Sequence, residues 1–284
     1  MIEAVGVVVP AHNEERLLPA CLRALRRAAG TVSMPVHLLV VADACTDQTI
    51  AAARAGGARV TGIRARNVGA ARAAGMAELL RLTADTRPAA VWLATTDADS
   101  VVPPHWLRRQ LRYASQGWDV VLGTVSVADW DGHPPHVPAA FEARYDFGDG
   151  PHPHVHGANL GIRASAYLAA GGFRSLRTAE DHALLAAVTE AGCPVLQASD
   201  ITVQTSARRL ARAPAGFSHL LRILTGQRGV SRPATGSEGS PLRRLGVISW
   251  PGTTLTRCSS SWSGPSTSQG RPRCRSPFRF TARR

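Results

Sequence analysis

The feature that most constrains this chain is the alternation of short apolar runs with helical segments through its first 95 residues. Val5–Val9 is a continuous β-branched run typical of a strand buried on both faces. Arg16–Ala28 then places its leucines and Cys21 at helical spacing. The alternation continues as strands at His37–Asp43, Arg59–Arg64 and Ala90–Thr95, and as helices at Asp47–Gly56 and Asn67–Leu82, with Asn67 a candidate N-cap. This order predicts a doubly wound α/β sheet flanked by helices.

Acidic and amide side chains follow three of the predicted strands. Asn13 and Glu14 come after the first strand, and Asp43 ends the second. Asp97 and Asp99 come directly after the strand at Ala90–Thr95. Because ligands of open α/β sheets collect at the carboxyl ends of the strands, we expect these side chains to form one site.

The residues in the loops after these strands limit the kinds of ligand that such a site could bind. No G-x-G-x-x-G pattern follows Val9, which argues against a nicotinamide or flavin cofactor, and the chain contains no Lys for a Walker phosphate loop. The D-x-D pair of Asp97 and Asp99 offers the oxygen ligands that Mg²⁺ or Mn²⁺ prefers. A nucleotide diphosphate held through a divalent cation is the expected ligand.

The net charge of +13 is carried mostly by the C-terminal part of the chain. From Gly226 onward there are eleven Arg and one acid, a net charge of +10, in a segment rich in Ser, Gly and Pro. This composition predicts a folded domain at 1–225 and a disordered low-complexity tail at 226–284. A basic arm for anionic lipid or nucleic acid is the alternative, and we expect no nucleic-acid partner.

Cysteine usage and hydropathy bear on the compartment. The five cysteines are odd in number and form no C-x-x-C pair, which argues against a disulfide framework or a zinc knuckle. No apolar run approaches the roughly 20 residues of a transmembrane helix, and the N-terminus lacks the basic lead of a signal peptide. We expect a cytoplasmic protein, with peripheral membrane contact left open.

Five segments, in order, resemble a family 2 glycosyltransferase of the glycosyltransferase-A fold. The resemblance covers about residues 4 to 225, and it implies that 1–225 is a catalytic domain built on a single Rossmann-like, doubly wound mixed sheet. It rests on VVVPAHNEE (7–15), VVADACTDQT (40–49), TTDADS (95–100), HGANLGIRASAYLAAGGF (156–173) and EDHALL (180–185).

The resemblance implies roles for the residues of the first half. Asp43 corresponds to an acid that contacts the nucleotide base, although the usual first acid of that pair is Ala42 here. Of the D-x-D pair, Asp97 faces the ribose or sugar and shares the metal with Asp99. The nucleoside pocket is implied at Pro10, Ala11, Asn13 and Glu14.

The resemblance also implies donor and catalytic residues farther along. Asn67 and Arg72 lie in the segment beside the ribose and diphosphate, and Arg72 would offer its N–H groups to phosphate. Gly157 and Asn159 belong to the segment beside the donor sugar, where glycine allows close backbone approach. Glu180 and Asp181 match the family's acid pair, with Asp181 the expected base at the start of a helix.

Several residues keep more than one interpretation. His156 or His182 could complete the metal site, or be hydrogen-bonded loop histidines. The other histidines of the two Pro-rich stretches (His133, His136, His152 and His154) are open in the same way. Arg208 and Arg209 could hold phosphate or an acidic acceptor, or form a solvated basic loop. Asp43 and Asp47 could cap the helix that follows them.

The resemblance implies a metal-dependent inverting glycosyltransferase of hexosyltransferase type. Its donor would be a UDP- or GDP-linked sugar, and its acceptor a hydroxyl group on a small molecule or lipid carrier. The alternatives are a nucleotidyltransferase-like enzyme, for which the loop after the first strand lacks glycine and lysine, and a degenerate nucleotide-sugar-binding domain. Oligomeric state is left open.

Overall fold

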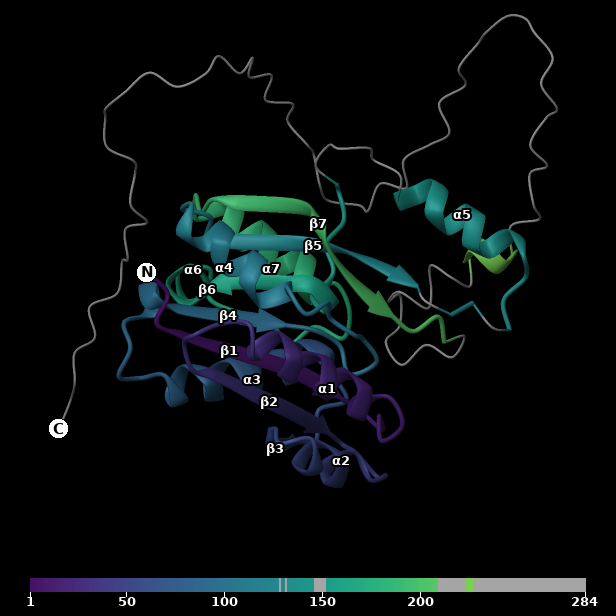
Figure 1. Ribbon diagram of the computed structural model, residues 1–284, viewed down its shortest axis with the longest axis horizontal. Coiled ribbons are helices and arrows are strands. Elements are labelled where there is room, and N and C mark those ends of the chain that lie inside the picture. Colours follow the sequence, from purple (N-terminus) through teal and green to yellow (C-terminus); the bar gives the residue numbers. More distant parts are fainter. Residues whose placement is uncertain (128, 131, 146–151, 209–222, 227–284) are drawn as a thin grey trace, which may run out of the picture. The chain divides into compact units, whose positions relative to one another are not determined.

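The computed structural model describes residues 1–127, 129–130, 132–145, 152–208 and 223–226. Within that part of the chain, seven strands form one sheet in the order β3-β2-β1-β4-β6-β5-β7 (Figure 1). The strands are β1 (Ala4–Ala11), β2 (Val36–Asp43), β3 (Arg59–Ile63), β4 (Val91–Thr95), β5 (Val120–Val127), β6 (Leu160–Arg163) and β7 (Val195–Thr205). The predicted single mixed α/β sheet is confirmed.

Strand direction brings the predicted site residues to one edge. β1 pairs in parallel with both β2 and β4, and β2 pairs in parallel with β3. Their carboxyl ends therefore point the same way. β6 runs antiparallel between β4 and β5, and β7 returns parallel to β5.

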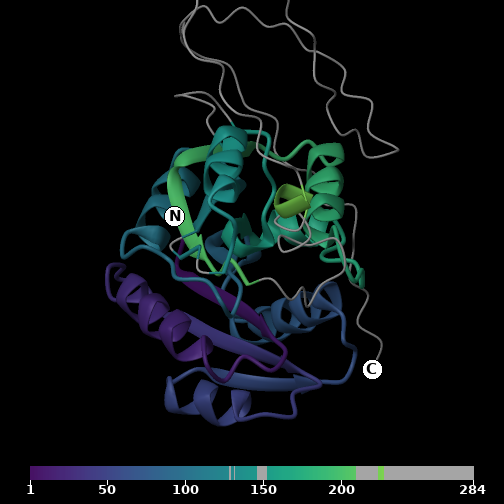
Figure 2. The same ribbon diagram turned by 90° about the vertical axis from the view of Figure 1, so that its right-hand side faces the viewer.

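Helices cover both faces of the sheet (Figure 2). They are α1 (Leu18–Ala29), α2 (Thr49–Ala55), α3 (Val68–Leu82), α4 (Trp106–Ser115), α5 (His136–Tyr145), α6 (Ala164–Ala169) and α7 (Glu180–Glu190), with short 3₁₀ turns η1 (Pro88–Ala90) and η2 (Gly157–Asn159). One core cluster joins α1 and α4 to alternate residues of β1, including Val7. The other joins α3, α6 and α7 to the opposite face, including Val8. Burial of these two apolar layers is the main source of stability.

Two predicted caps appear at the starts of helices. Asn67 precedes α3, and its Oδ1 accepts a hydrogen bond from Ala70 N at 3.0 Å. Asp47 lies one residue before the N-cap Gln48, and its Oδ1 accepts from Thr49 N at 3.0 Å; α2 begins two residues later than the sequence pattern predicts. Both are short polar side chains that satisfy a backbone N–H left open by the helix.

A separate small cluster surrounds α5. Val137 and Phe141 of this helix pack with Ala207 and Leu224. Helix α5 lies in the connection between β5 and β6. Its contact with Ala207 therefore joins this connection to the residues that follow β7. The predicted tail at 226–284 lies outside the described residues except for Gly226, and its boundary stays a prediction. None of the helices among the described residues has both the length and the apolar character to cross a membrane.

Candidate functional site

Four non-glycine residues with positive φ surround the predicted site. In the described part of the chain, these are Asn13 (55°), Ala44 (51°), Arg66 (47°) and Ala179 (59°). The left-handed region costs a residue with a Cβ about 1 kcal/mol, and such costs persist where the surroundings impose them. Each of the four directly adjoins a predicted site residue: Glu14, Asp43, Asn67 or Glu180. The backbone is thus held in unusual conformations where the sequence predicts chemistry.

Asp43 organises the loop between β3 and α3. Its Oδ1 accepts from the backbone N–H of Ala65 (2.7 Å) and Arg66 (2.8 Å), and its Oδ2 accepts from Asn67 N (2.7 Å). The side chain is buried, with 4% exposure. The Asp43 carboxylate therefore fixes the loop before α3, and not the start of α2, the helix that follows it in sequence. Its contact with a nucleotide base stays a prediction.

The first loop is tied to the second by the residues that the sequence singled out. Asn13 Oδ1 accepts from Thr46 N at 2.8 Å, and Glu14 N donates to Thr49 Oγ1 at 2.7 Å. Ala11 is buried at the end of β1, while Pro10 and Asn13 are partly exposed. The loops after β1 and β2 therefore form one bonded unit along the carboxyl edge.

Arg72 lies at the centre of a buried ion network. Its side chain is 3% exposed, and its Nη2 donates to Asp97 Oδ1 at 2.6 Å. Its Nη1 forms an ion pair with Glu180 Oε1, and its Nε donates to Thr95 Oγ1 at 3.2 Å. Burial raises the pKa of Glu180, and Arg72 opposes that rise. The predicted phosphate-binding arginine thus holds the first acid of the D-x-D pair together with the predicted acid pair.

Gly157 lies against the guanidinium of Arg72. A Cβ at position 157 would overlap the terminal guanidinium atoms of Arg72, so a larger residue there would have to displace that guanidinium. The backbone N–H of Gly157 donates to Asp181 Oδ2 at 2.8 Å, and His182 N donates to Asp181 Oδ1 at 2.8 Å. The segment before β6, the start of α7 and the end of β4 therefore meet at one point.

Asp99 and Glu14 share a second guanidinium. Arg208 Nη2 lies 2.5 Å from Asp99 Oδ2, and Arg208 Nη1 lies 2.6 Å from Glu14 Oε1. Both acid side chains are nearly buried, at 8% and 5% exposure. Burial raises the pKa of Asp99 to about 6, with Asp97 and Glu14 adding to the rise and Arg208 opposing it. Two buried carboxylates that already attract a cation suit a divalent ion with oxygen ligands.

The remaining predicted residues lie nearby with different surroundings. Asn159 is buried, at 1% exposure, with its Nδ2 donating to Thr124 O (2.8 Å) and Ile201 O (2.9 Å). Its Oδ1 accepts from Trp106 Nε1 at 2.8 Å. In this structure Asn159 joins elements beneath the site, and its contact with a donor sugar stays a prediction.

The histidines form a stack rather than a ready metal centre. The rings of His152 and His154 are 6.1 Å apart, and those of His154 and His156 are 5.5 Å apart. Burial lowers the pKa of His156 to about 3, while nearby Asp181 opposes the shift. Among the residues that the structure describes, no three His, Cys, Asp or Glu side chains are placed to hold an ion. A cation held by one or two carboxylates and by substrate phosphates needs no such group.

Sequence reasoning identified both arginines but not their partners. The sequence does not distinguish a binding role of Arg208 from a solvated loop residue, because no local pattern links it to Glu14, which lies 194 positions away. The sequence predicts Thr95 only as the last residue of a strand, whereas its hydroxyl accepts a hydrogen bond from Arg72. Arg209 lies outside the described residues.

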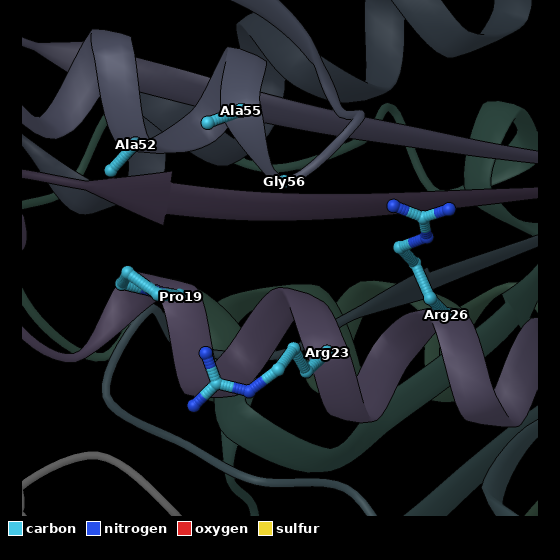
Figure 3. A pocket seen from close by; sticks show the side chains of 6 residues that line it. All are labelled: Pro19, Arg23, Arg26, Ala52, Ala55 and Gly56. Carbon is cyan, nitrogen blue, oxygen red and sulfur yellow. The ribbon is translucent and has the colours of Figure 1, made fainter.

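A groove elsewhere on the surface lies between α1 and the end of α2 (Figure 3). It is lined by Pro19, Arg23, Arg26, Ala52, Ala55 and Gly56. None of the predicted site residues lines it, so it does not mark the chemistry described above.

Solved structures of similar fold include two that contain a bound nucleotide sugar. Residues 1–349 of S. aureus TarS in complex with UDP-GlcNAc align with a TM-score of 0.53 at 17% identity, covering 79% of this chain and 65% of that chain. A mannosyltransferase from Pyrobaculum calidifontis in complex with GDP-Man and Mn²⁺ aligns with a TM-score of 0.52 at 19% identity, covering 78% and 60%. At these identities the likeness establishes the fold.

Sequence relatives and a family model give the classification. The undecaprenyl-phosphate 4-deoxy-4-formamido-L-arabinose transferase of Serratia proteamaculans is 33% identical over 129 residues, which is 44% of this chain and 37% of the relative. Its counterpart from Klebsiella pneumoniae (strain 342) is 31% identical over 128 residues, with the same coverage. The chain thus matches well under half the length of these relatives. The model of glycosyl transferase family 2 matches residues 6–169, more than half of the chain. The chain belongs to glycosyl transferase family 2 and is a glycosyltransferase.

Proposed function

We propose that this glycosyltransferase moves a sugar, with inversion, from a UDP- or GDP-linked donor to a lipid-carrier or small-molecule acceptor, and that a divalent cation assists. The observation that carries the proposal is the pairing of buried Asp99 and Glu14 around a positive charge at the carboxyl edge. Fold neighbours bound to UDP-GlcNAc, or to GDP-Man with Mn²⁺, support the donor class and the ion. Relatives named for transfer to undecaprenyl phosphate support a lipid-carrier acceptor.

The oxygen ligands of the edge fit the proposed ion. We assign Asp99 as the principal protein ligand, with Asp97 facing the ribose or sugar beside it. Mn²⁺ or Mg²⁺ would supply Lewis-acid stabilisation of the departing diphosphate. The network from Asp97 through Arg72 to Glu180 holds the donor edge and the acid pair in register, because one buried guanidinium contacts both.

Asp181 is the proposed base. Inverting transfer to a hydroxyl acceptor needs a group that takes the proton from the attacking oxygen. Asp181 is partly exposed in the first turn of α7, where an acceptor could approach it. Two backbone N–H groups fix its orientation beside the Gly157 segment, which the family resemblance associates with the donor sugar.

The direct test is transfer itself. The purified chain is incubated with UDP- and GDP-sugars, short polyprenyl phosphates or polyprenols, and Mn²⁺, and the products are analysed by mass spectrometry. We expect a glycosylated acceptor with inverted anomeric configuration, lost on addition of EDTA. Transfer that persists at full rate in EDTA would exclude the proposed role of the ion, and retained configuration would exclude the role of Asp181.

A further inference from the structure

Arg208 connects the two acids that the proposed cation site depends on. Its guanidinium contacts Glu14 from the loop after β1 and Asp99 from the loop after β4. Its own side chain is 26% exposed, so it reaches inward from the protein surface. A single side chain that bridges two nearly buried carboxylates acts as their counter-ion.

The position of Arg208 is built by several elements. Beyond β4, Val101 N donates to Gln204 O at 2.7 Å, and Gln204 N donates back to Val101 O at 3.1 Å. This bridge holds the end of β7 next to Asp99. Past the strand, His133 Nε2 hydrogen-bonds Ala207 O at 2.5 Å, and Ala207 packs with the α5 cluster described above. The backbone that leads into Arg208 is therefore held beside Asp99.

The charges around Arg208 are unbalanced. Asp97, Asp99 and Glu14 all interact with the guanidinium, which supplies only one positive charge. A divalent cation carries more charge and seeks the same carboxylate oxygens, so it competes with the guanidinium.

We propose that Arg208 is a displaceable counter-ion of the donor site. In the ligand-free enzyme its guanidinium holds Glu14 and Asp99. When the donor enters with its cation, the guanidinium leaves Asp99 and donates N–H bonds to the donor diphosphate. This inference rests on the proposed function. It adds that the cation alone binds poorly because Arg208 must be displaced without gaining a phosphate partner.

The test measures Mn²⁺ binding by electron paramagnetic resonance, first without nucleotide and then with UDP or GDP. In Arg208→Gln, and in Arg208→Met, which keeps the apolar stem, affinity for Mn²⁺ alone should rise about tenfold, because a competing cation is gone. Affinity for the nucleotide diphosphate in the presence of Mn²⁺ should fall about tenfold, because a charge-assisted phosphate contact is lost. A purely structural role would weaken both.

Two further variants serve as controls. Arg208→Lys keeps a positive charge and should stay within about threefold of wild type for Mn²⁺ alone. Arg109→Gln removes an arginine of α4 that pairs with Asp200 of β7, away from the acids, and should change neither affinity. Circular dichroism checks the fold of each variant.

The proposal requires opposite changes in the two affinities of the neutral variants. If Mn²⁺ alone binds them no more tightly than wild type, or if their nucleotide affinity is unchanged, the counter-ion role is overturned. Failure of the proposed function looks different, because wild type itself would then bind no nucleotide diphosphate in the presence of Mn²⁺.

Discussion

Asp97 and Glu180 are joined by the buried guanidinium of Arg72, although they lie on separate parts of the chain. Asp97 follows β4 at the carboxyl edge of the sheet, and its side chain is 38% exposed, whereas Glu180 begins α7 and is 5% exposed. The positions of Asp97 and Glu180 thus depend on one guanidinium, that of Arg72. Replacing Arg72 by a neutral residue leaves the buried carboxylate of Glu180 without its partner.

Arg72→Met should lower the free energy of unfolding by about 3 kcal/mol, since breaking a buried ion pair strands a charge. Adding Glu180→Gln should restore at least about 1 kcal/mol of that loss. Urea unfolding of the two single variants and the double variant measures this coupling. Arg81→Met, on the exposed side of the same helix, is the control and should leave stability unchanged. Additive losses would contradict the network.

Gly157→Ala should displace Arg72, because the added methyl group would occupy the position of the guanidinium. We expect a loss of about 1–3 kcal/mol in stability together with a loss of transfer activity. Gly62→Ala is the matched control, because a Cβ at that position has no neighbour within 4 Å. In an Arg72→Met background the cost of Gly157→Ala should shrink. An equal cost in both backgrounds would mean that the clash is with something else.

Stability of the metal-free protein should depend on the titration of Asp99. Its pKa is raised to about 6, above its unfolded value, so the folded state retains a proton that the unfolded chain releases near pH 4. Asp99 therefore destabilises the fold progressively as the pH rises from about 4 to 6, by roughly 2–3 kcal/mol in total. Asp99→Asn lacks this titration.

The measurement is urea unfolding of wild type and Asp99→Asn in EDTA between pH 4 and pH 8. Relative to wild type, Asp99→Asn should become more stable as the pH rises to about 6 and then stay level. A difference that is constant with pH, or that changes in the opposite direction, would show that Asp99 titrates normally.

Asp181→Asn should lower kcat by a factor of about 10² to 10⁴, the usual contribution of a general base. Donor affinity should stay within about twofold, because the proposed role concerns the acceptor proton. Glu190→Gln, at the exposed end of the same helix, is the control. The melting temperature separates this role from a structural one, since Asp181 also accepts two backbone N–H bonds. Comparable losses in kcat, donor affinity and melting temperature would assign Asp181 to structure alone.

The sequence predicted the elements through β4 because their signals are local. Residues a few positions apart are enough to predict buried strands at Val5–Val9 and His37–Asp43, and an N-cap at Asn67. Strands β5 and β7 were not predicted, because their arrangement with the antiparallel β6 is set by tertiary packing.

The candidate site was predictable in its residues but not in its contacts. Asp43 was identified as a binding acid, yet its bonds to the Ala65–Asn67 backbone depend on where the next loop lies. The two guanidiniums bridge acids that come from loops after different strands or from a distant helix. Such pairings follow from the sheet order, which composition and spacing do not encode.

The most direct test of the cation-assisted donor site is calorimetric titration of UDP- and GDP-sugars into wild type and Asp99→Asn, with and without Mn²⁺. We predict saturable binding of one donor to wild type that needs Mn²⁺, and binding at least about tenfold weaker to Asp99→Asn. Donor binding that is equally tight without Mn²⁺, or that is unaffected by Asp99→Asn, would contradict the account.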